Sequence, residues 1–184
     1  MTRVFVGGSR KVTRLAPEVR ARLDRIMAKG LPVVVGDANG ADKAVQRYFS
    51  DRGYAHVEVF CSDTVPRNNV GAWPVRVVQP AHSRRDFDYY ATKDRAMAAE
   101  ATVGLMLWDG ESHGTLMNVL RLNASGKPTV VYVQPRKSVV DIRTSADLMA
   151  FLAGLRANSA KRLRAGARAE GLSYQIDQAA LELR

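Results

Sequence analysis

The segment from Val103 to Val133 constrains the fold more than any other part of the chain. It begins with Val103–Trp108, an apolar run without polar alternation, which is typical of a strand buried on both faces of a parallel sheet. A polar loop with two glycines follows, and apolar residues then recur at helical spacing from Leu116. Thr129–Val133 is a second strand-like run. The segment therefore predicts a parallel strand–helix–strand unit, with the loop and the helix N-terminus at one spot that suits an anion.

Two similar units precede this segment. Val4–Val6 and Leu31–Val35 are short apolar runs, each followed by glycines and a helical pattern, and Val57–Phe60 is a further expected strand. This order predicts an α/β protein with a Rossmann-like open, mainly parallel sheet flanked by helices, and with a helical C-terminal tail. We expect residues 1–135 to form the Rossmann-like domain and residues 136–184 to form an accessory, mostly helical basic tail.

Composition limits the partners and the compartment. The formal net charge is +10, but the charges are spread along the chain, so phosphorylated or polyanionic partners are only weakly favoured. The densest basic block, Arg156–Arg168, is interpreted as a solvated helix face. The apolar runs are too short to cross a bilayer, and Met1–Arg3 leads directly into a strand without a signal peptide. With Cys61 as the single cysteine, we expect a cytoplasmic protein without a disulfide, metal, cofactor or membrane partner.

One catalytic pattern is present and is rejected. Gly110–Gly114 fits G-x-S-x-G, the nucleophile elbow of serine hydrolases, in the required strand-to-helix context. That mechanism needs a base histidine downstream of the serine, but the histidines are His56, His82 and His113. Ser112 is therefore interpreted as a helix N-cap.

The two earlier loops are candidate ligand-binding loops. Gly7–Lys11 and Gly36–Asp42 follow parallel strands at their C-terminal ends, where open α/β folds bind ligands. Neither loop matches G-x-G-x-x-G or the P-loop pattern. The sequence therefore does not predict an ordinary dinucleotide dehydrogenase or a P-loop NTPase.

Helix starts can be predicted from side chains that cap backbone N–H groups. Asn39 is the expected N-cap of the second helix, and Ser83 with Asp86 predicts a capped helix over Arg84–Glu100. Arg95 lies near the end of that helix, where its side chain faces either solvent or the shared loop face.

Taken together, three loops resemble the SLOG superfamily in its YspA-like branch. The motifs, in order, are VGGSR at Val6–Arg10, GDANGAD at Gly36–Asp42 and WDGESHGT at Trp108–Thr115, and the resemblance covers roughly residues 3–135. This family contains Rossmann-like relatives of the DNA-processing protein DprA and of the LOG phosphoribohydrolases. The resemblance implies a nucleotide or nucleotide-derived ligand. The expected ligand-binding residues are Gly7, Gly8, Ser9, Arg10, Gly36, Asp37, Asn39, Gly40, Asp42, Arg95, Asp109, Gly110, Ser112, Gly114 and Thr115.

The LOG reaction is not implied by the resemblance. LOG enzymes cleave an N-glycosidic bond with a Gly-Gly-x-Gly-Thr-x-x-Glu loop, and on alignment the glutamate position is Asn118. An amide cannot act as the carboxylate base or stabilise an oxocarbenium ion by charge. Asp37, Asp109 and Glu111 are acids on the same face and are candidates for a different reaction. The alternative interpretation is that Asp109 and Glu111 are ordinary loop residues and that Asp37 only hydrogen-bonds the backbone of its own turn.

Three functions are therefore in competition. A nucleotide-binding sensor or binding module is preferred, because binding motifs are present and the aligned catalytic acid is absent. An N-glycosidase or phosphoribohydrolase-like enzyme is the alternative. DprA-like binding of nucleic acid, weak and non-specific, is a second alternative that depends mainly on charge. We also expect the chain to form a homo-oligomer.

Overall fold

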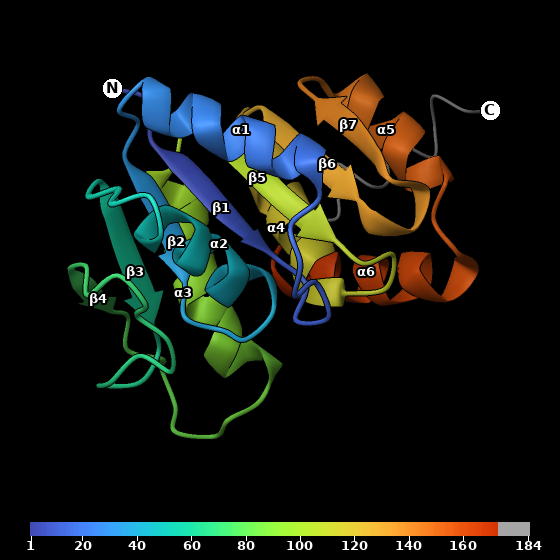
Figure 1. Cartoon of the computed structure of the whole chain (residues 1–184). Helices are drawn as coiled ribbons and strands as arrows, with labels where there is room; N and C mark the ends of the chain where they lie inside the picture. Colours follow the sequence, from blue (N-terminus) through green and yellow to red (C-terminus); the bar gives the residue numbers. More distant parts are fainter. Residues whose placement is uncertain (173–184) are drawn as a thin grey trace.

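The computed structural model describes residues 1–172 of the chain, and within them one sheet has the strand order β4-β3-β2-β1-β5-β6-β7 (Figure 1). Neighbouring strands pair in parallel, apart from the antiparallel pair β6 and β7. This confirms the predicted α/β fold with a Rossmann-like, mainly parallel sheet. The strands are β1 (Val4–Gly8), β2 (Val33–Gly36), β3 (Val57–Cys61), β4 (Val75–Val77), β5 (Val103–Trp108), β6 (Thr129–Val133) and β7 (Ser138–Ile142).

Helices cover both faces of the sheet. The helices are α1 (Pro17–Ala28), α2 (Ala41–Ser50), α3 (Phe87–Glu100), α4 (His113–Ala124), α5 (Ser145–Ala153) and α6 (Ala157–Ala169), with a 3-10 turn at Gln134–Arg136. One core lies between the sheet and α1 and α2, and the other lies between the sheet and α3, α4, α5 and α6. Figure 1 shows α1 and α2 in front of the sheet and α3 and α4 behind it. Within the described residues, no helix has the length and apolarity needed to span a membrane.

The strand order reverses direction beside β1. The chain proceeds outward from β1 through β2 and β3 to β4, and α3 then returns it to β5 on the other side of β1. In register, Gly8 at the end of β1 lies opposite Leu107 of β5. The loops that follow β1 and β5 therefore leave the sheet side by side, which is where open α/β sheets have their binding crevice.

The region after residue 135 begins with a strand that the sequence did not predict. Ser138–Ile142 pairs antiparallel with β6, after a tight turn in which Lys137 has a left-handed φ of 48°. The strand is short and carries Asp141, so its pattern was too weak to separate from a loop. The helices α5 and α6 that follow agree with the expected helical tail, whereas the domain division at residue 135 stays a prediction.

Two helices begin later than the sequence predicted. The N-cap of α3 is Asp86, whose carboxylate accepts the Tyr89 N–H at 3.1 Å, so Ser83 does not open this helix. The N-cap of α2 is Gly40 with a φ of 83°, and the preceding Asn39 accepts a hydrogen bond from Asn68 instead. A Cβ at residue 40 would lie 2.2 Å from the Arg10 carbonyl oxygen, so the close approach of the two loops requires glycine there.

Candidate functional site

A cleft of about 920 Å³ lies above the C-terminal ends of β1 and β5. This volume lies within the range of small-ligand sites. All three predicted loops contribute to its walls, and α3, α4 and α6 complete them. The predicted site residues that line it are Gly7, Gly8, Arg10, Asp42, Asp109, Glu111, Ser112, Gly114 and Thr115.

The other predicted residues lie behind the cleft or away from it. Those that do not line it are Ser9, Gly36, Asp37, Asn39, Gly40, Arg95 and Gly110. The Ser9 hydroxyl is buried, lies 3.1 Å from the Thr115 hydroxyl and accepts the Asp109 N–H at 3.1 Å, so it ties the first loop to the third. Arg95 forms ion pairs with Asp88 at 2.8 Å and Glu170 at 3.3 Å.

Most of the loop glycines have a structural explanation. A Cβ at residue 8 would lie 2.3 Å from the Leu107 carbonyl oxygen, and a Cβ at residue 36 would lie 2.4 Å from the Asp42 carboxylate. Gly110 has a φ of 87°. Gly114 differs, because a Cβ there would meet nothing within 4 Å. Glycine in a helix costs about 0.5–1 kcal/mol relative to alanine, and no contact within the described part of the chain accounts for that cost.

The first turn of α4 presents free backbone donors to the cleft. Ser112 occupies the N-cap position, as predicted, but its side chain makes no capping hydrogen bond, and α4 has no acid in its first turn. Its hydroxyl instead accepts a hydrogen bond from Thr115 at 3.1 Å. The Asp109 carboxylate accepts the N–H groups of Glu111 at 2.9 Å and Ser112 at 2.7 Å, which holds the loop in place. The N–H groups of His113, Gly114 and Thr115 thus remain available to an anion, whereas that of Leu116 is donated to the Ser112 carbonyl at 3.4 Å.

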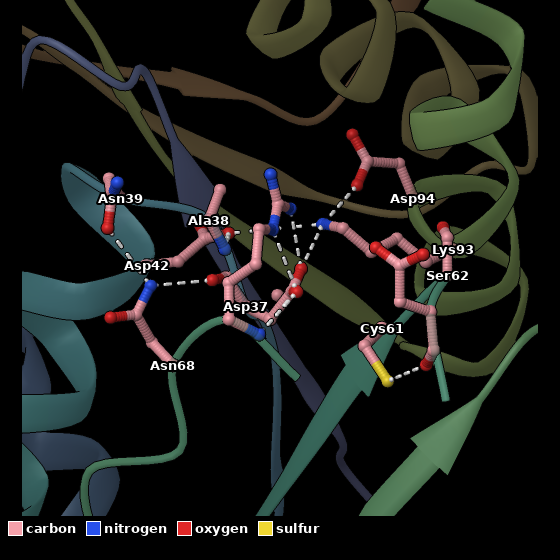
Figure 2. Close-up of polar contacts among 12 residues, drawn as sticks. Asp37, Ala38, Asn39, Asp42, Cys61, Ser62, Asn68, Lys93 and Asp94 are labelled. Atoms are coloured by element: carbon pink, nitrogen blue, oxygen red, sulfur yellow. Dashed lines mark hydrogen bonds and ion pairs between the residues drawn. The ribbon is translucent and has the colours of Figure 1, made fainter. Parts of the chain in front are cut away.

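Asp37 belongs to a buried ion cluster behind the cleft (Figure 2). Its carboxylate accepts two hydrogen bonds from the Arg67 guanidinium, at 2.7 and 2.9 Å, and a third from the Arg67 backbone N–H at 3.1 Å. Burial acts to raise the pKa of Asp37, but Arg67 and Lys93 outweigh it, so the net pKa is lowered. Asp37 is a permanently paired carboxylate that anchors the loop after β3.

Lys93 of α3 is buried at the floor of the cleft among three carboxylates. Its Nζ lies 3.1 Å from Asp94, 3.8 Å from Asp37 and 4.0 Å from Asp42, and Figure 2 shows the ammonium group between Asp94 and Asp37. Burial lowers the pKa of Lys93, but the three acids outweigh burial and raise it. Burial also raises the pKa of Asp42 to about 6, with the negative charge of Asp94 adding to the effect. The floor therefore combines a permanent cation with hydrogen-bonding oxygens.

Asn118, at the aligned LOG glutamate position, also lines the cleft. Its amide donates to Asp94 at 3.2 Å and accepts from Arg121 at 2.5 Å. The Asn118 amide is thus held between Asp94 and Arg121. The carboxylate beside this position therefore belongs to Asp94 of α3, whereas the aligned LOG glutamate would lie on α4.

Two cations in the cleft wall have no acidic partner among the described residues: Arg10, after β1, and Arg162, on α6. In contrast, Glu111 is bound by Lys11 at 2.8 Å and Arg156 at 3.1 Å, and these partners lower the pKa of Glu111. The basic block Arg156–Arg168 is therefore more than a solvated helix face, because Arg162 lines the cleft and Arg156 pairs with Glu111 in the cleft wall.

The sequence patterns do not predict several of the residues that line the cleft: Arg67, Arg85, Phe87, Tyr90, Lys93, Asp94 and Arg162. They come from the loop after β3, from α3 and its approach, and from α6, and these segments carry no glycine motif. The long irregular loop from Ser62 to Pro74 was the one available signal, because such loops are often functional.

The fold and the cleft define a Rossmann-like α/β protein with a ligand-sized cleft at the point where the strand order reverses. No family model and no curated protein matches the chain. Among solved structures, the chain is similar to DNA processing protein A from Helicobacter pylori, described for its single-stranded DNA binding mode, with 15% identity and a TM-score of 0.49. The match covers 71% of this chain and 64% of that chain, which is less than two thirds of its length.

Proposed function

We propose that the protein is a nucleotide-binding module of the YspA-like SLOG type, which binds a mononucleotide or a nucleotide-derived ligand in the cleft above β1 and β5. The observation that carries the proposal is Gly114, which lies in the first turn of α4 and lines the cleft with open space in front of it. A glycine at a helix N-terminus lets a phosphate approach the backbone N–H groups closely. We further propose a cytoplasmic location and self-association, which depend on the sequence alone.

The cleft offers suitable partners for each polar part of a nucleotide. The phosphate would bind the first turn of α4, with Arg10 and Arg162 supplying positive charge from two walls. The ribose hydroxyl groups would donate hydrogen bonds to the oxygens of Asp94 and Asn118 on the floor. These assignments require a ligand that carries both an anion and hydroxyl groups.

Binding is favoured over catalysis by the state of the candidate acids. Asp37 is held by Arg67, Asp109 accepts two backbone N–H groups, and Glu111 is paired with Lys11 and Arg156. A general base or nucleophile needs a carboxylate that is free to reach the reacting atom. The N-glycosidase alternative would therefore have to release one of these carboxylates from its partners or use a different acid.

The proposal predicts that a nucleotide stabilises the wild-type chain. It also predicts that Gly114→Ala raises the stability of the ligand-free protein but weakens nucleotide binding. A ligand at about 100 times its dissociation constant should add roughly 2.7 kcal/mol to the free energy of unfolding. The added methyl group should raise the ligand-free stability by about 0.5–1 kcal/mol, because the helical position is open. The same methyl group should weaken nucleotide binding. Thermal unfolding with a panel of nucleoside mono-, di- and triphosphates, ADP-ribose and NAD measures both effects.

Two results would contradict the proposal. One is the absence of any thermal shift with every compound of the panel at millimolar concentration. The other is an unchanged nucleotide affinity in Gly114→Ala. Robust release of free base from AMP by the purified protein would instead favour the enzyme alternative, and Glu111→Gln would then test whether Glu111 is the catalytic acid.

A further inference from the structure

Phe87, the first residue of α3, lines the cleft although 47% of its surface is exposed. Other large apolar side chains that are exposed among residues 1–172 lie outside the cleft: Met1, Val65, Val70, Val75 and Val77. An aromatic ring left in water inside a ligand-sized cleft offers apolar surface that a ligand can cover. Phe87 has no role in the phosphate or ribose contacts proposed above.

The ring of Phe87 lies beside that of His113, which is the first residue of α4 and directly precedes Gly114. The ring centroids are 4.9 Å apart and the planes are inclined by 43°. The backbone of α6 packs against the histidine ring, because a Cβ at Gly166 would lie 2.8 Å from its Cε1 and Nε2 atoms. Burial, followed by the positive charges of Arg162 and Arg121, lowers the pKa of His113, so the ring is uncharged at neutral pH. The two rings form a neutral aromatic surface, in which α6 packs against the His113 ring.

We propose that the Phe87–His113 pair is the nucleobase subsite, and that the ligand is a single nucleotide whose phosphate binds the adjacent first turn of α4. The inference depends on the proposed function. An aromatic surface directly beside an anion-binding helix end, with Arg10 and Arg162 in the same walls, fits a ligand with a flat ring at one end and an anion at the other. Stacking on an aromatic ring tolerates all bases, because every base has a π-face. The subsite therefore accepts purines and pyrimidines.

The test compares ligands with and without a base. The full chain is titrated calorimetrically with AMP, GMP, CMP and UMP, and with ribose 5-phosphate, which keeps the sugar and the anion. The variants are Phe87→Ala, Phe87→Leu and Phe87→Tyr, with Val77→Ala on β4 as a control, because Val77 is similarly exposed and lies outside the cleft. We expect nucleoside monophosphates to bind about 5- to 100-fold more tightly than ribose 5-phosphate, as base stacking on one aromatic ring allows.

The variants separate stacking from a general loss of structure. Phe87→Ala should remove most of the advantage of the base while leaving the affinity for ribose 5-phosphate unchanged, Phe87→Leu should behave similarly, and Phe87→Tyr should keep the advantage. Equal affinities for nucleotides and ribose 5-phosphate, or an equal loss of both in Phe87→Ala, would overturn the base subsite but leave the phosphate site standing. If none of these compounds binds the wild-type chain, the proposed function fails, and the subsite fails with it.

Discussion

At the scale of single residues, Asp42 links the cleft floor to pH. Burial raises its pKa from 3.8 to about 6, so the folded chain holds a proton on this carboxyl more strongly than the unfolded chain does. The resulting stabilisation is present below about pH 4 and is lost as the pH rises through about 6. Asp42→Asn removes this titration, so the variant should gain up to about 3 kcal/mol relative to wild type between pH 4 and pH 7. Urea unfolding across this range measures the difference, with Asp51→Asn at the C-cap of α2 as the control, and parallel curves for wild type and Asp42→Asn would contradict it.

At the scale of elements, α6 is held by a buried ion network at its C-terminal end. The Glu170 carboxylate accepts hydrogen bonds from Arg121 at 2.5 and 2.8 Å and from Arg95 at 3.3 Å, and the Arg121 side chain is 6% exposed. Glu170→Gln leaves Arg121 without its counter-charge and with fewer acceptors, and should destabilise the fold by roughly 1–3 kcal/mol. Because α6 also carries Arg162, nucleotide affinity should fall although Glu170 does not line the cleft. Thermal unfolding and calorimetry measure the two effects, with the exposed Glu18→Gln on α1 as the control. An unchanged affinity would show that the Glu170 ion pairs are not needed to hold α6 at the site.

At the scale of the whole molecule, the positive charge is distributed over separate surfaces. A second groove, of about 480 Å³, crosses α1 and α2 and carries the cations Arg20, Lys43, Arg47 and Arg52. With a formal net charge of +10, the protein should bind single-stranded DNA non-specifically, with a dissociation constant weaker than about 1 µM at physiological salt. The logarithm of the affinity should fall linearly with the logarithm of the salt concentration. Fluorescence anisotropy with oligonucleotides of different sequence tests this, and tight, sequence-selective binding at physiological salt would show it to be wrong.

The sequence predicts best what is encoded locally. The apolar composition of Val103–Trp108 predicts a strand that is buried on both faces of the sheet. The three loops directly follow parallel strands, so a parallel sheet alone predicts that they meet at one cleft. Lys93 shows the limit of this reasoning. Within α3, Lys93 has the sequence context of an ordinary surface lysine. Its burial depends on the missing side chain of Gly36 and on two acids of the Gly36–Asp42 loop.

The aromatic and cationic residues in the walls of the cleft could not be predicted from the sequence for the same reason. Phe87 is the first residue of α3, whereas the sequence predicts that this helix starts three residues earlier, at Arg84. Arg162 lines the cleft only because α6 packs against α4. Neither position follows from periodicity, since both depend on packing between elements distant in the sequence. The strand β7 was missed because its few alternating residues compete with a polar turn and with Asp141.

The pairing of β1 with β5 has a consequence for how the molecule is made. Val4 lies opposite Val103, so nearly one hundred residues must be synthesised and collected before the two central strands can meet. Closing so long a loop is entropically costly, and contacts of this separation slow folding. The cleft lies at that junction and takes a further wall from α6, close to the C-terminal end of the described chain. During translation the binding surface is therefore completed only after α6 has been synthesised, whereas α1, α2 and their strands are able to pair earlier.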